Sequence, residues 1–256
     1  GGTRPMNPST ELTGDRSETA GRCARLTLRS EDGELRLSLR VSPPRLLAAM
    51  GVVIVLLAVA STVAVGALAF FRWSEGSLGY ATVKLFWLDT EYNLPTLYQF
   101  VTLAVAGALM FSIAGQPWIE RSVDRARWRV LGGAFLFLAV DEMMRIHETV
   151  GDTSSFTFGA AGLLIYVPLV IVIGLWWLPL LQRLDARTRL LLIAAAGLYL
   201  GGAAGIESIS QLHAGESGKT TPLYVVLATL EEVFEMAGIA LLVYALLEYH
   251  RRGEAR

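Results

Sequence analysis

Six long apolar runs constrain the fold of this chain more than any other feature. A helix needs about 20 mostly apolar residues to cross the hydrocarbon core of a bilayer. Six windows reach that length: Leu46–Phe71, Leu94–Gly115, Val130–Val150, Phe158–Leu181, Leu190–Gln211 and Leu223–Tyr249. They lack the apolar-polar alternation of a transmembrane barrel. With 53% hydrophobic and only 18% charged residues, the chain predicts an all-α fold, a polytopic membrane helix bundle with six transmembrane helices over residues 45–250.

The distribution of basic residues predicts how this bundle is oriented. Lysine and arginine accumulate on the cytoplasmic side of membrane proteins. The N-terminal segment, the second and fourth loops and the C-terminus hold eighteen of the 22 basic residues, whereas Arg72, Lys84 and Lys219 are all that the alternate segments hold. Both termini are therefore predicted to be cytoplasmic, including a short tail over residues 251–256. Tryptophans at both predicted boundaries are typical of interfacial belts: Trp73, Trp87, Trp118, Trp128, Trp176 and Trp177.

The segment before the first run divides into two parts. Residues 1–23 are rich in Gly, Ser, Thr and Pro, which predicts a disordered cytoplasmic tail. Residues 24–42 show two alternating runs around Asp32-Gly33, which predicts an amphipathic β-hairpin. A lone hairpin is marginally stable in water, so we expect it at the membrane surface with its arginines near anionic lipid. A partly ordered tail is the alternative interpretation.

The stretch between the first two runs, Trp73–Asn93, is expected to be an outer loop. Asn93 and Pro95 stand where the second helix is expected to begin, and they are typical of an N-cap and of a first-turn proline. Glu91 then lies at the outer mouth of that helix.

Ionisable residues inside the predicted spans mark a candidate site, because charges are costly in hydrocarbon and are usually functional there. The third and fifth runs are predicted to lead outward and the sixth inward. Their acids therefore meet in the outer half of the bilayer, in a shared polar pocket that opens outward. The candidate site residues, all proposed as metal ligands, are Asp141, His147, Glu148, Glu207, Glu231, Glu232 and Glu235.

Helical spacing adds detail to this pocket. Glu231 and Glu235 are one turn apart on one face, where they can bind one cation, share a proton or pair with Arg145. Left bare and ionised, the two carboxylates would repel each other. The fifth run also has glycines at four-residue spacing, a pattern that predicts close helix packing. These are Gly197, Gly201 and Gly205.

Three functions fit this pattern. Carboxylates with one histidine suit a divalent transition metal (Fe, Mn or Zn), which would make the protein a membrane metalloenzyme, a hydrolase or an oxidase. However, the Glu-x-x-His pairs of soluble di-iron bundles are missing, because Met144 and Ser210 stand three residues before the two nearest histidines. The second interpretation is a proton- or cation-coupled transporter or channel, although the opposite half of the spans reads as apolar and without matching acids. The third is an accessory or sensory membrane protein, so whether the chain is an enzyme stays open.

Several other classes are excluded by residues that the spans lack. No lysine lies within a span to form a retinal Schiff base, and a single histidine there rules out bis-histidine haem. Neither a phosphate-binding glycine loop nor a nucleophile elbow is found, and no nucleic-acid partner is expected. Cys23 is the single cysteine, so no intrachain disulfide forms.

Three stretches together resemble a set found in uncharacterised bacterial multi-pass membrane proteins. They are LDTEYNLPT at Leu88–Thr96, Asp141-Glu142 with His147-Glu148, and Glu231-Glu232 with Glu235-Met236. The resemblance covers about Phe86 to His250. It implies a bacterial inner-membrane protein of a family with no established activity.

Overall fold

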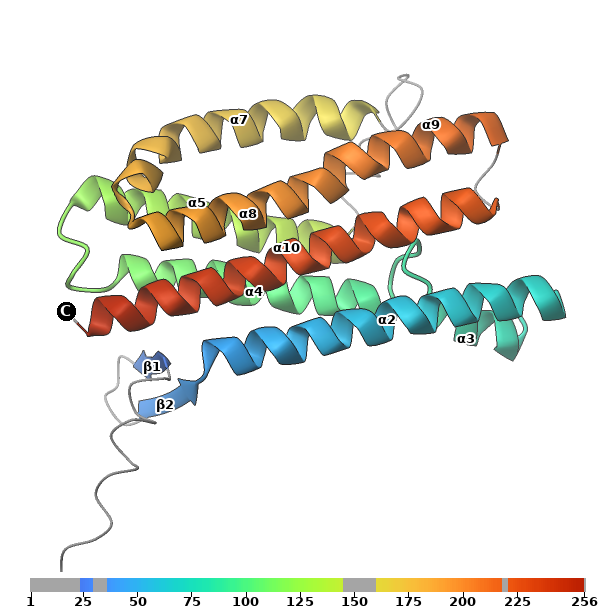
Figure 1. Cartoon of the computed structure of the whole chain (residues 1–256), viewed down its shortest axis with the longest axis horizontal. Coiled ribbons are helices and arrows are strands. Elements are labelled where there is room, and N and C mark those ends of the chain that lie inside the picture. The colour runs from blue at the N-terminus through green and yellow to red at the C-terminus, as the bar shows by residue number, and fades with distance from the viewer. Residues whose placement is uncertain (1–23, 30–35, 145–159, 218–220, 256) are drawn as a thin grey trace, which may run out of the picture.

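The computed structural model describes residues 24–29, 36–144, 160–217 and 221–255, and within these it is built almost wholly of helices (Figure 1). The elements in chain order are β1 (Ala24–Arg29), β2 (Arg36–Val41), α2 (Pro43–Phe71), α3 (Leu78–Phe86), α4 (Leu94–Ala114), α5 (Ser122–Met144), α7 (Ala160–Arg183), α8 (Ala186–Leu200), the π-helix η1 (Gly201–Ile206), α9 (Glu207–Ser217) and α10 (Pro222–Glu254).

Three of the described helices are long and apolar enough to cross a membrane. They are α2, α4 and the run Ala186–Gly215, in which α8, η1 and α9 follow one another without a break. A shorter apolar helix, Val167–Arg183, lies within α7. The helical fold class and the membrane-helix character of the chain are thus confirmed. That all six runs cross a membrane stays a prediction.

The strands β1 and β2 precede the helices and pair antiparallel. Their register places Ala24 opposite Val41 and Arg29 opposite Arg36, and β1 also contacts α10. The Asp32-Gly33 turn lies outside the described residues, as does the tail over residues 1–23.

Side-chain caps define where several helices begin. Asn93 Oδ1 accepts hydrogen bonds from the Thr96 amide (2.9 Å) and hydroxyl (3.0 Å), and Pro95 occupies the first turn of α4. The predicted cap is therefore confirmed. Thr221 caps α10 in the same way, accepting from the Tyr224 amide at 3.3 Å with Pro222 in the first turn.

The stretch predicted as an outer loop contains a helix, α3, so that part of the prediction is wrong. Ser77 caps α3 by accepting a hydrogen bond from the Tyr80 amide at 3.2 Å. A serine N-cap favours the start of a helix, even in a segment of mixed polarity such as this one. The turn after α3 is fixed to α2, because the buried Ser61 hydroxyl accepts from the Leu88 amide at 3.0 Å.

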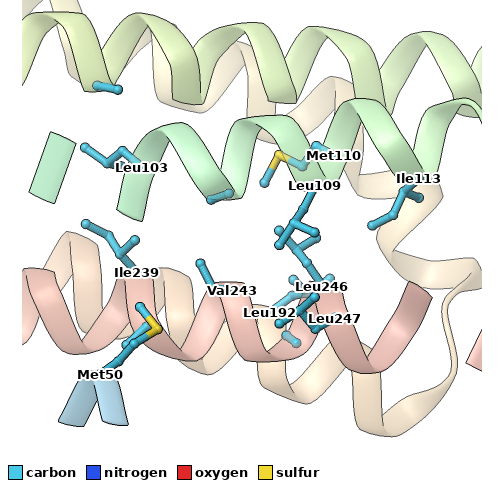
Figure 2. Close-up of a cluster of buried hydrophobic side chains, with 14 of the residues drawn as sticks. Met50, Leu103, Leu109, Met110, Ile113, Leu192, Ile239, Val243, Leu246 and Leu247 are labelled. Atoms are coloured by element: carbon cyan, nitrogen blue, oxygen red, sulfur yellow. The ribbon is translucent and has the colours of Figure 1, made fainter. Parts of the chain in front are cut away.

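Helix α10 is the centre of the bundle. It contacts α2, α4, α8, η1 and α9, and Figure 1 shows it running along most of the length of the bundle. Its middle is apolar and buried, as required of a helix that is surrounded by others. Figure 2 shows the side chains that meet there from four helices: Met50, Leu103, Leu109, Met110, Ile113, Leu192, Ile239, Val243, Leu246 and Leu247.

Glycines set the closest helix approaches. A Cβ on Gly238 of α10 would lie 2.6 Å from the Tyr199 backbone nitrogen of α8. A Cβ on Gly202 in η1 would lie 2.7 Å from the Glu231 carbonyl oxygen of α10. Gly107 and Gly132 bring α4 and α5 together, because a Cβ on either would lie within 3.0 Å of the other's carbonyl oxygen.

The glycine spacing noted in the sequence does not mark a packing face, so that prediction is wrong. A Cβ on Gly197, Gly201 or Gly205 would meet nothing within 4 Å. The π-helix explains part of the difference. Its i→i+5 hydrogen bonds widen the helix, so the 100° step assumed for an α-helix does not hold from Gly201 to Ile206.

Substituting the two kinds of glycine should give opposite results. Gly238→Ala forces α8 and α10 apart, and overpacking of this kind costs about 1–3 kcal/mol. Gly197→Ala, its matched control, adds a methyl group to open space in a helix and should be neutral or stabilising by up to about 1 kcal/mol. Denaturant or thermal unfolding of the purified protein in detergent measures both. Equal stability of the two variants would contradict the packing described here.

Candidate functional site: the acidic end

Three of the acids of α10 lie in its first half, and the part of the bundle around them is called the acidic end. Glu231, Glu232 and Glu235 are half-buried and fall within about one turn of each other. The acidic end comprises these acids and the residues that interact with them directly or through Tyr199: Asp89, Gln99, Asp141, Glu142, Tyr199, Glu207, Ser210 and Tyr224.

Glu232 has a neutral partner from α4. The Gln99 side-chain Nε2 donates to Glu232 Oε2 at 2.8 Å, and Gln99 is only 2% exposed. Its other amide atom, Oε1, has no hydrogen-bond partner. An amide donor orients a carboxylate without neutralising its charge, so this contact leaves the charge of Glu232 uncompensated.

Glu231 is linked to α9 through Ser210. The Ser210 hydroxyl lies 3.0 Å from Glu231 Oε2 and 2.9 Å from the Glu207 carbonyl oxygen, and Ser210 is buried. Because a hydroxyl carries one proton, it donates to one of these oxygens at a time or shares the proton between them. Glu207, the first residue of α9, is thereby held beside the acids of α10.

Helix α5 brings two further acids to the acidic end. Asp141 is 5% exposed and Glu142 is half-buried, both in the last turn of the described helix. Glu142 interacts electrostatically with Glu232 and Glu235, and Tyr199 of α8 interacts with both α5 acids. Acids of α5, α9 and α10 therefore interact with one another through Glu142, Glu207 and Glu235, while the role of the predicted residues as metal ligands stays a prediction.

The turn before α4 contributes a further acid, Asp89, to the acidic end. The Tyr224 hydroxyl donates to Asp89 Oδ1 at 3.0 Å, and Asp89 interacts electrostatically with Glu232. This contact attaches the turn between α3 and α4 to the first turns of α10.

Two predicted ligands, His147 and Glu148, lie outside the described residues, as does Arg145. Among the residues that the structure describes, no three His, Cys, Asp or Glu side chains form a group that could hold a metal ion. The transition-metal interpretation therefore depends on His147 and Glu148. What the described residues do provide is a set of carboxylates, two of which, Glu232 and Glu231, are oriented by hydrogen bonds from Gln99 and Ser210.

Sequence reasoning missed Gln99, Tyr199 and Asp89 as members of this site, and Glu142, although noted in the sequence, was not among the predicted ligands. Only charged side chains inside spans were taken as site candidates, which passed over Gln99 and Tyr199. A signal for Gln99 was present, because Thr96, Gln99 and Thr102 recur every three residues in an otherwise apolar run. All three are buried on the inner face of α4.

The fold and the acidic end define a helical protein with membrane-length apolar helices and a partly buried carboxylate cluster. The chain belongs to the family described as "Domain of unknown function (DUF8692)", whose model matches residues 44–249. The match extends from the second residue of α2 almost to the end of α10 and includes every residue of the acidic end. No curated protein and no solved structure matches the chain.

The opposite end of α10 has buried charges of its own, so the expectation that this half lacks acids is wrong. Glu248 is 4% exposed and accepts from Arg251 at 3.1 Å and Arg252 at 3.5 Å. Nearby, buried Asp124 of α5 accepts from Arg127 at 2.9 Å and from Arg183 of α7 at 3.2 Å. We call this the basic end.

Two of the predicted interfacial tryptophans belong to the core of the basic end. Trp128 is fully buried and Trp177 is nearly so. Trp128 meets Trp177 edge-on at 5.3 Å and stacks on Tyr249 at 5.6 Å between ring centroids. The interfacial prediction is wrong for these two, because their rings fill the space between α5, α7 and α10.

Titratable groups at the basic end respond to this packing. Burial opposes ionisation of Asp185, but hydrogen bonds from the Thr188 hydroxyl and amide and the charge of Arg252 lower its pKa below the ordinary value. Asp185 caps α8 through the same bonds. Burial lowers the pKa of His250, and Glu254 opposes this only in part.

Stability should depend on pH through His250. Gln116 Nε2 lies 3.1 Å and Ser112 Oγ 3.3 Å from His250 Nε2, contacts that a neutral imidazole satisfies. The pKa of His250 in the folded protein lies below its value in the unfolded chain, which is about 6.5. As the pH falls, the unfolded chain is therefore protonated before the folded protein is. The contribution of neutral His250 to the free energy of unfolding is therefore complete above about pH 6.5 and is lost as the pH falls below that value.

The comparison that isolates this effect uses His250→Gln, which keeps a hydrogen-bonding group that does not titrate. The free energy of unfolding, measured between pH 8 and 5, should fall more steeply in the wild type than in the variant. Parallel pH profiles for the two proteins would show that His250 does not contribute.

Proposed function

We propose that the acidic end binds a positively charged species, a proton or a small cation, and that the protein is a proton- or cation-coupled membrane transporter. The observation that carries this proposal is the convergence of Glu231, Glu232 and Glu235 with acids from α5 and α9. Carboxylates that interact electrostatically and are partly removed from water repel one another when ionised, and a bound cation or shared proton relieves that repulsion. Buried carboxylates mark ion pathways in membrane proteins.

The proposal includes a membrane orientation. In this frame the six apolar runs cross a bacterial inner membrane, both termini are cytoplasmic and the acidic end opens outward. The excess of Lys and Arg at the basic end and in the termini supports it. The strands β1 and β2, with their arginines, would then lie at the cytoplasmic surface beside anionic lipid.

A cysteine at Glu216 tests the orientation. In a Cys23→Ser background, a membrane-impermeant maleimide added to intact cells should label this position, because the end of α9 lies on the outer side in the proposed frame. Labelling that appears only after the cytoplasmic face is exposed would reverse the orientation.

Ion movement tests the function. Proteoliposomes should show proton or cation flux that falls to the level of empty liposomes in Glu232→Gln, because the neutral amide no longer attracts a cation. Glu75→Gln, which removes an exposed acid outside the acidic end, is the matched control and should keep wild-type flux. Wild-type flux equal to that of empty liposomes would contradict a transport function.

A transition metal is the second candidate, favoured by the position of Asp141 and Glu142. These acids approach α10, and the chain continues directly from them to His147 and Glu148. Carboxylates and imidazole together suit Fe, Mn or Zn. Elemental analysis of the same preparations decides this candidate. About one metal per chain, reduced by Glu235→Gln, would support it, whereas trace metal unchanged by that substitution would remove it.

A further inference from the structure

The unpartnered oxygen of Gln99 points to a more specific ligand for the acidic end. Gln99 is almost completely buried, and its amide group faces Glu232, to which Nε2 donates at 2.8 Å. Its Oε1 lacks a hydrogen-bond partner. Buried polar atoms without partners are rare in native proteins and disfavour the folded state, so each has a structural or functional cause.

Protonation of Glu232 does not leave both ends of the Gln99 amide with a hydrogen-bond partner. If Glu232 were protonated and donated to the amide oxygen, Gln99 would have to rotate, and its NH2 group would become the unpartnered end. A cation bound by Oε1 is different, because Nε2 can continue to donate to Glu232 while the oxygen is ligated. Carboxylate and amide oxygens together are ligands of hard cations.

The immediate contact of Gln99 favours a cation of low charge. Gln99 contacts a single carboxylate, and one positive charge compensates it. Other acids of the cluster add to the electrostatic attraction, since Glu232 interacts with Glu235, Glu142 and Glu231.

We propose that Gln99 Oε1 and the Glu232 carboxylate form a binding subsite for a hard monovalent cation of the sodium class. The proposal rests on the function proposed above and names the ion. Gln99 is then a ligand that determines specificity, because an amide oxygen binds a metal cation but is not protonated near neutral pH.

Thermal unfolding of the full chain in detergent tests the subsite, in sodium, lithium, potassium or choline chloride at equal ionic strength. Sodium at about ten times its dissociation constant should lower the unfolding equilibrium constant of the wild type about tenfold relative to choline. Gln99→Leu and Glu232→Gln should both lose this effect. Gln116→Leu, which removes a glutamine at the basic end, is the matched control and should retain it.

The outcomes separate this inference from the proposed function. A sodium effect that survives Gln99→Leu but not Glu232→Gln would overturn the role of Gln99 and leave the function standing. If the unfolding equilibrium constant of the wild type is the same in sodium and in choline, while flux still depends on Glu232, protons alone bind. That result would also overturn the sodium subsite. Absence of both effects would overturn both proposals. Should Gln99→Leu fail to fold, Gln99→Asn keeps the amide but withdraws it by one methylene and should weaken the sodium effect.

Discussion

The close packing of α10 is the constraint on which the rest of the structure depends. One helix contacts α2, α4, α8, η1 and α9, and such a helix must be apolar around its middle. Gly238 and Gly202 let α8 and η1 approach its backbone, where any side chain would separate the helices. The approach at Gly202 places the first half of α10 beside η1 and α9, so the acidic end depends on this close packing.

The two ends of α10 stabilise buried carboxylates in different ways. At the basic end, Glu248 and Asp124 are each neutralised by two arginines. Pairing of this kind offsets the cost of desolvating both partners and fixes neighbouring helices to one another. Asp124 in particular joins α5 to α7 through Arg183.

Much of the fold and part of the site could be predicted from the sequence. Apolar runs located the long helices, and the residues around Asn93 located the start of α4, because hydropathy and capping are local properties. The convergence of acids from three helices followed from alternating chain direction. The packing glycines could not be predicted, because spacing alone does not distinguish Gly202 from Gly201, and the π-helix changes the angular step at this point. Gln99 was missed because the role of a neutral side chain depends on a partner far away in the sequence.

The acidic end differs from the basic end in that the hydrogen-bond partner of Glu232, Gln99, is uncharged. At the basic end the arginines are part of the chain, so the counter-charge is permanent and the ion pairs serve the structure. Gln99 orients Glu232 and supplies no charge, so in the proposed function the positive species is one that can bind and dissociate. Permanent arginine pairs would fill such a site, and an apolar partner would leave the carboxylate without orientation. A buried amide orients a carboxylate without compensating its charge, which is the property that the proposed cation binding requires.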